Sequence, residues 1–141
     1  MKKNYFLKFI LFIIPVSAFI LMSSSTGRDD GRTGSPGDGG NSCATCHSGS
    51  SSGTSVAITT NIPNEGYQTN TEYDITVTTT SSASSHGFQL TAEKTSDNSK
   101  IGSFTAGTGT RVTSSRITHS DDSQSSWSFK WTSPGTDVGD F

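Results

Sequence analysis

Apolar and polar side chains alternate with a period of two along residues 55–141. Two of these runs carry large side chains on one face, namely Tyr73, Ile75 and Val77, and then Trp127, Phe129 and Trp131. Two further runs carry Val56, Ile58, Thr60 and Ile62, and then Phe88, Leu90 and Ala92. Such alternation is typical of half-buried antiparallel strands, and turn-forming sequences separate the runs. The pattern predicts an all-β fold of two packed antiparallel sheets, with the aromatic residues in the core.

The first 25 residues follow a different pattern. Lys2 and Lys3 precede an apolar run from Phe9 to Leu21, which ends in small residues at 23–25. A charged start, a short apolar run and small residues are the features of an export signal. We therefore expect residues 1–25 to be a signal peptide and the protein to be exported, that is secreted, periplasmic or on the cell surface. The alternative is an uncleaved N-terminal membrane anchor, although the apolar run is short for a full span.

Residues 26–54 are rich in glycine, serine and aspartate, and they separate the signal from the strands. Glycine and turn-forming residues disfavour both helix and strand, so we expect a flexible segment without regular structure. Its one distinctive feature is the sequence Cys43-Ala44-Thr45-Cys46-His47.

This sequence has the form C-x-x-C-H, which is the attachment signal for c-type haem. Cys43 and Cys46 can each form a thioether with a haem vinyl group, and His47 can then bind the iron as the proximal ligand. The chain holds no other cysteines. The motif predicts one covalent haem c, and attachment outside the cytoplasm agrees with the export signal.

Two other uses of the cysteines stay open. In an exported protein the pair could form a short disulfide, structural or redox-active. A thioredoxin-like site is disfavoured, because the flanking Gly/Ser runs are not a βαβ pattern. A structural zinc site needs about four ligands, so His86 or His119 would have to join Cys43, Cys46 and His47.

A sixth iron ligand must come from the few remaining candidates. No methionine follows Met22, so the mature chain cannot supply His/Met ligation. His86 and His119 are the only other imidazoles, and His86, which precedes a predicted strand, is our candidate for the distal ligand. A haem on so glycine-rich a segment would be exposed, which suits electron exchange more than oxygen activation.

Composition and charge limit the classes of partner that the protein could bind. Apolar residues make up only 29% of the chain, so the core must be thin. Removal of Lys2, Lys3 and Lys8 with the signal leaves seven basic residues against 12 acidic ones, a net charge of −5. This charge argues against nucleic acid and against electrostatic docking on anionic lipid. No G-x-S-x-G elbow occurs, so the sequence gives no hydrolase signature, and we expect no enzymatic activity.

Two blocks of the strand region resemble the Reeler domain, the module at the N-terminus of reelin. The first block is Gly87–Ala92 followed by Ile101–Phe104, and the second is Ile117–Ser120 followed by Trp127–Pro134. The CxxCH segment ahead of them resembles the segment that some exported bacterial proteins place before a Reeler-like sandwich. These proteins vary in their C-terminal anchor. The resemblance implies an immunoglobulin-like β-sandwich, surface display and a role in interaction, without established catalysis. The family pattern continues beyond Phe141, so we expect a last strand, and any anchor, to be missing from residues 55–141.

Two functions follow as hypotheses. The first is an exported protein with one covalent haem c that acts in electron transfer or in haem-linked interaction with a redox or surface partner. The second is a haem-free extracellular adhesion or interaction module whose CxxC is a disulfide or a metal clip. A membrane would be reached only through an uncleaved signal or a C-terminal anchor.

Overall fold

The computed structural model describes Phe9, residues 26–47 and residues 53–141. Apart from Phe9, the predicted signal peptide lies outside the described residues, and so do residues 48–52. Within the described part, no helix combines the length and the apolar character that a membrane span requires.

The described part of the chain contains seven strands and two short 3-10 helices. The helices are η1 (Pro36–Asp38) and η2 (Cys43–Thr45). The strands are β1 (Ser55–Thr60), β2 (Glu72–Thr80), β3 (Gln89–Leu90), β4 (Ser103–Thr105), β5 (Thr110–Thr113), β6 (Arg116–His119) and β7 (Ser126–Thr132).

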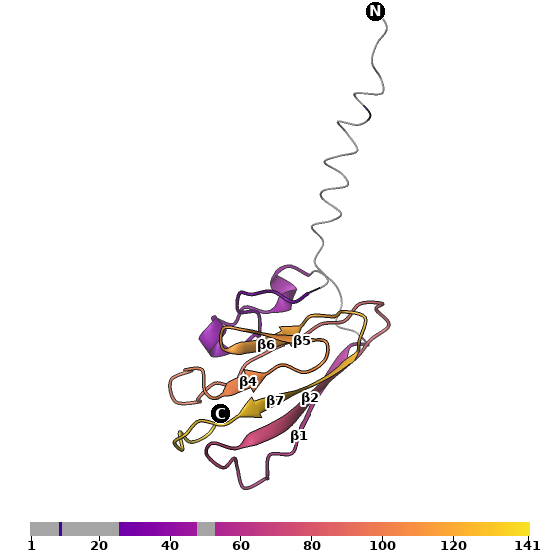
Figure 1. Ribbon diagram of the computed structural model, residues 1–141. Coiled ribbons are helices and arrows are strands. Elements are labelled where there is room, and N and C mark those ends of the chain that lie inside the picture. Colours follow the sequence, from indigo (N-terminus) through magenta and orange to yellow (C-terminus); the bar gives the residue numbers. More distant parts are fainter. Residues whose placement is uncertain (1–8, 10–25, 48–52) are drawn as a thin grey trace, which may run out of the picture.

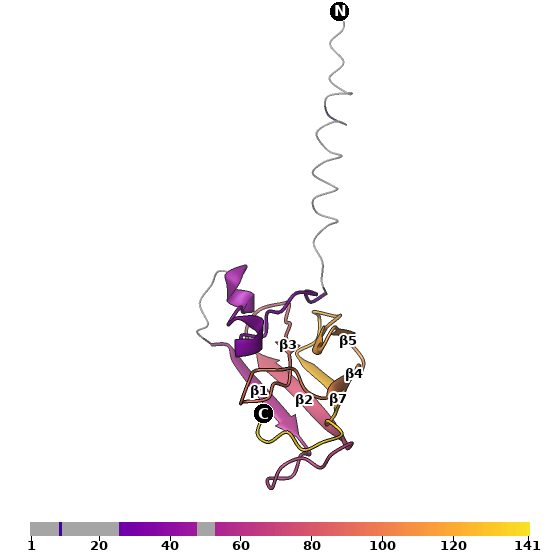
Figure 2. The same cartoon turned by 90° about the vertical axis from the view of Figure 1, so that its left-hand side faces the viewer.

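The strands form two antiparallel sheets, as the alternating pattern predicts. One sheet has the order β1-β2-β7-β4 and the other has the order β3-β6-β5 (Figures 1 and 2). The sequence-based prediction of an antiparallel β-sandwich is confirmed. Strands β2 and β7 are neighbours although many residues separate them in the chain. The larger sheet therefore forms only when distant segments of the chain pair.

The core lies between β2, β7 and the smaller sheet. In the register of β2 and β7, Tyr73 lies opposite Trp131, Ile75 opposite Phe129, and Val77 opposite Trp127, and all six are buried. Phe88, Ala92 and Ile117 complete the buried set from the other side. The two aromatic runs predicted to be core are therefore core. The run around Phe88 is shorter as a strand than predicted, because only Gln89–Leu90 pair with β6.

The first predicted strand forms, but its burial differs from the prediction. Val56 and Ile58 lie on the inward parity of β1, opposite Thr79 and Val77, yet they stay 62% and 57% exposed. The cause is the extent of the second layer. Strand β1 is at the edge of its sheet, and β3, at the edge of the smaller sheet, has only two residues, so the second layer covers β1 incompletely.

Residues 26–47 lie against the smaller sheet, whereas their composition predicted a flexible segment. Figure 1 shows this indigo-to-purple segment beside β5 and β6, and Figure 2, turned by 90°, shows it beside β3. The backbone N–H of Gly27 donates to the carbonyl of His119, and Gln89 Nε2 donates to the carbonyls of Arg28 and Asp30. Contacts between residues about 60 to 90 positions apart hold the segment, and local composition contains no sign of them.

Candidate functional site

The Cys43–His47 motif folds as a single helical turn. The backbone N–H groups of Cys46 and His47 both donate to the carbonyl of Cys43, at 3.1 and 3.0 Å. On such a turn, positions i, i+3 and i+4 lie on one side. Cys43, Cys46 and His47 occupy these positions, so the three residues with reactive side chains emerge together.

Both thiols of the motif are free and exposed. Cys43 Sγ lies 3.8 Å from the carbonyl oxygen of Arg32, and the two cysteines are not joined as a disulfide. Among the residues that the structure describes, no group of three or more His, Cys, Asp or Glu side chains is arranged to hold a metal ion. The ligand set for a zinc clip, with His86 or His119 joining the motif, is therefore not assembled in this part of the chain.

An open cavity of about 350 Å³ lies between the motif and the smaller sheet. Cys43, Cys46 and His47 line one part of its wall, and His86 lines another. The cavity thus brings together all four residues that the sequence singled out, although His86 lies far from the motif in the chain. Phe88 and Thr118 of the sandwich also contribute to the lining.

The two other imidazoles in the cavity differ in their hydrogen bonds. His86 Nε2 lies 3.1 Å from the Ser81 hydroxyl. His119 Nδ1 accepts the backbone N–H of Phe88 at 3.1 Å, and its ring packs near Trp127. A methyl group at Gly87 would meet the His119 ring at 2.3 Å, so this position needs glycine. Both residues are half-buried, but the His119 ring bonds to the backbone of the sandwich, whereas the His86 ring contacts a side chain.

Two arginines that sequence reasoning did not select also line the cavity. Arg28 and Arg32 both bind the carboxylate of Asp30, at 2.6 and 2.8 Å. Arg28 and then Arg32 lower the pKa of Asp30 to about 2. Two guanidinium groups share one carboxylate here, and Asp122 adds a second carboxylate to the lining of the cavity. No spacing rule marked these residues, because the docking of the segment sets their positions.

A buried group of charges joins the segment to the sandwich. The carboxylate of Asp38 is fully buried, accepts from Arg116 Nε at 3.0 Å and binds Lys100 Nζ at 2.9 Å. Hydrogen bonds from Arg116 hold the pKa of Asp38 far below its usual range, against the opposing effect of burial. Thr33 Oγ1 also donates to Asp38, at 2.5 Å.

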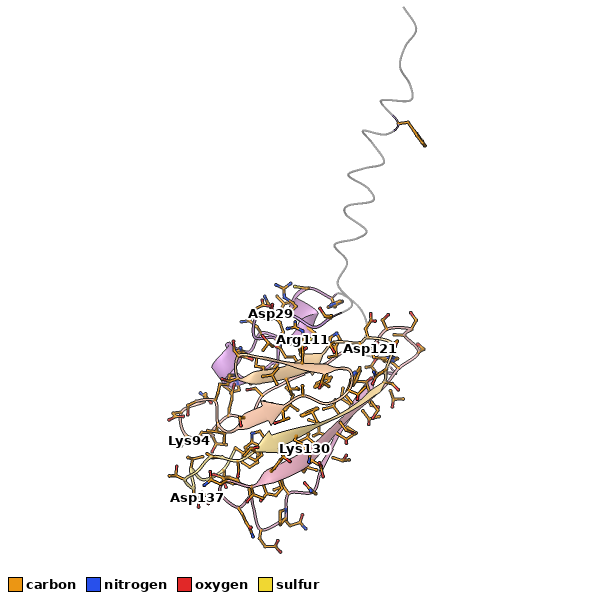
Figure 3. The ribbon with its side chains drawn as sticks, viewed as in Figure 1. Asp29, Lys94, Arg111, Asp121, Lys130 and Asp137 are labelled. Atoms are coloured by element: carbon orange, nitrogen blue, oxygen red, sulfur yellow. The ribbon has the colours of Figure 1, made fainter. Side chains whose placement is uncertain are left out.

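Glu93 of the sandwich extends this group. It accepts the Ser35 hydroxyl at 2.5 Å and the backbone N–H of Gly37 at 2.9 Å, and it also pairs with Lys100. Burial raises the pKa of Glu93, but the bonds from Lys100, Ser35 and Gly37 outweigh burial, so the pKa is lowered. A further ion pair at the surface, Asp29 with Arg111 of β5, joins the same two parts of the chain at 2.6 Å (Figure 3).

Comparison with known proteins gives a family and several solved structures that match the chain. Residues 41–141, which include the Cys43–His47 motif, match the Reeler domain family. A crystal structure of the human F-spondin reeler domain is 18% identical, with a TM-score of 0.47, and the match covers 62% of this chain and 67% of that one. A crystal structure of the Reelin-N domain of F-spondin is also 18% identical, with a TM-score of 0.45, and covers 66% and 71% of the two chains. No curated protein matches the chain.

Proposed function

Because this chain belongs to the Reeler domain family, whose domains are found in extracellular proteins, we propose that it is an exported protein that carries one covalent haem c. Its role is electron transfer, or a haem-linked interaction with a redox or surface partner. Cys43 and Cys46 hold the haem by thioethers, and His47 is the proximal iron ligand.

One observation carries the proposal: the motif forms a turn that faces a cavity which also contains His86. Thioether attachment needs two thiols on one side and an imidazole just beyond them. The turn supplies this arrangement, and the thiols are exposed and not paired with each other. The residues present therefore fit the group.

Each residue of the site then has a separate task. The thiols of Cys43 and Cys46 tether the haem, which supplies one-electron redox chemistry when bound. His47 would hold the iron as the proximal ligand. His86 would be the second ligand, and its Nε2 would then give up its contact with the Ser81 hydroxyl. His119 keeps its bond to the backbone of Phe88 and stays structural.

The openness of the cavity favours electron exchange as the role. Cys43, Cys46 and His47 are all exposed, so a haem on this turn keeps an edge in contact with solvent. Solvent exposure lowers the reduction potential of a haem, and an exposed edge allows a partner to approach. Covalent attachment of haem distinguishes this function from that of a haem-free interaction module, and it can be measured directly.

The test is the intact mass of the mature protein, exported from cells that possess c-type maturation machinery. A denaturing gel stained for haem peroxidase activity runs beside it. The expected result is a mass increased by one haem that survives denaturation. The Cys43→Ala/Cys46→Ala double variant should lose the added mass and the stain.

Thr45→Ala is the matched control, because it changes the same turn at a position that C-x-x-C-H leaves free. It should keep the haem. A bare polypeptide mass in the wild-type protein would overturn the proposal. A loss of two mass units, which indicates a Cys43–Cys46 disulfide, would support the haem-free interaction module instead.

A further inference from the structure

The loop that precedes the motif closes on itself. Thr33 and Ser42 form an isolated antiparallel bridge at its base, and the backbone N–H of Gly34 donates to the carbonyl of Asn41 at 2.8 Å. Asn41 Nδ2 donates to the carbonyl of Asp38 at 2.9 Å, which braces the inside of the loop. Cys43 follows directly after Ser42. The position of the loop therefore fixes the position from which the motif turn starts.

Polar contacts, not apolar packing, hold this loop on the sandwich. The hydrophobic core and the side chains packed against it contain no residue from 26–47. Four charged side chains meet at this contact, two buried carboxylates and two partly buried cations: Asp38, Glu93, Lys100 and Arg116. We refer to these four residues as the Asp38 clamp. Two carboxylates and two cations balance within it.

The balance makes the clamp sensitive to the loss of one member. A buried charge is stable only while it is paired, and removal of one partner leaves the other uncompensated. Asp38 is the only member that belongs to the segment, and its side chain is fully buried. Its loss would leave Arg116 and Lys100 with Glu93 as their one remaining carboxylate.

We propose that the Asp38 clamp sets the position of the Cys43–His47 turn relative to His86, which makes Asp38 a positioning residue of this site. The clamp acts on the loop of residues 33–42, and the loop carries the turn to the cavity wall. The role in iron ligation rests on the proposed function, whereas the control of the position of the segment does not.

Asp38→Asn tests this inference, because asparagine keeps the shape and removes the charge. Asp97→Asn is the matched control, since the exposed Asp97 side chain bonds within its own turn to Ser99 and pairs with Lys94, which also lies outside the clamp. Hydrogen exchange of amides in residues 26–47 is compared with that of amides in β2 and β7. We expect exchange in the segment to rise at least about tenfold in Asp38→Asn, with the strands unchanged. Asp97→Asn should match the wild-type protein.

The absorption spectrum of the haem-loaded variant provides the second readout. Haem should stay attached in Asp38→Asn, because attachment needs only the motif, but the ferric spectrum should change from low spin to high spin as His86 loses contact. If Asp38→Asn does not fold, Arg116→Gln disrupts the clamp from the side of the sandwich and serves in its place.

Two outcomes overturn the inference: unchanged exchange in the segment, or an equal rise in segment and strands. An unchanged spin state alongside faster exchange overturns the link to His86. A chain without haem overturns the proposed function, but the exchange measurement still decides whether the clamp positions the turn.

Discussion

His86 and His119 line the same cavity, but single hydrogen bonds give them different expected roles. The His86 ring contacts a serine hydroxyl, whereas His119 Nδ1 accepts the backbone N–H of the buried Phe88. If His86 gave up its contact with the Ser81 hydroxyl for iron, the cost in free energy would be small. If His119 gave up its bond, the backbone N–H of Phe88 would be left unsatisfied, which costs about 1 to 3 kcal/mol.

We therefore expect opposite effects from two alanine variants of the haem-loaded protein. His86→Ala should convert a low-spin ferric spectrum to a high-spin one, with little change in the free energy of unfolding. His119→Ala should leave the spectrum unchanged but lower the free energy of unfolding by about 1 to 3 kcal/mol. Optical spectra and urea titrations measure the two effects. A high-spin spectrum in His119→Ala, with His86→Ala unaffected, would reverse the assignment.

At this scale, sequence reasoning could select only part of the candidate site. Cys43, Cys46 and His47 are adjacent in the chain, so their spacing alone predicts the chemistry. His86 could be nominated only because the mature chain has few imidazoles. Arg28 and Arg32 could not be found at all, because they line the cavity only after Gln89 has bound the backbone around them.

The strands show where periodicity predicts burial and where it does not. For β2 and β7 the period-two pattern gave the correct strand and the correct buried face, since each lies inside its sheet with a second layer above it. For β1 the same pattern gave the strand but not the burial. Alternation reports which side a residue faces, and the extent of the opposing sheet decides whether that side is covered.

Ile58 and Val77, which lie opposite each other in the β1–β2 register, allow a direct test. Val77 is 1% exposed, so Val77→Thr buries a hydroxyl and should cost about 1 to 3 kcal/mol of unfolding free energy. Ile58 is 57% exposed, so Ile58→Thr should cost less than about 1 kcal/mol. Urea unfolding followed by circular dichroism gives both values. Equal costs would mean that Ile58 is covered in solution.

At the scale of the whole molecule, charge joins the Gly-rich segment to the sandwich. The pairs that do so connect positions far apart, such as Asp38 with Arg116 across 78 residues. Local composition predicted little regular structure in residues 26–47 but could not indicate docking, since each carboxylate alone looks like an exposed surface charge. The fold class was thus accessible from the sequence, and the arrangement of its two parts was not.

This junction should make stability depend on pH on the acid side. Arg116, followed by Thr33 and Lys100, holds the pKa of Asp38 well below its unfolded value of about 3.9. A lowered pKa stabilises the folded state above the unfolded value, and this stabilisation is lost as the pH falls toward the folded value. The free energy of unfolding should be nearly constant from about pH 7 to about pH 5 and fall below about pH 4. Asp38→Asn should be less stable at neutral pH and lose less on acidification, as urea titrations at each pH would show. An identical acid slope in both proteins would exclude Asp38 as the source.

Both tryptophans of the chain, Trp127 and Trp131, are buried in β7, and Trp127 packs on His119, which lines the cavity. Indole emission overlaps haem absorption, and energy transfer over such short separations is efficient. The native protein therefore carries its own optical reporter: the bare polypeptide fluoresces, and the haem-loaded form is quenched. Loss of that quenching on denaturation would report the unfolding of the haem-loaded form, because unfolding moves Trp127 away from a haem tethered at Cys46.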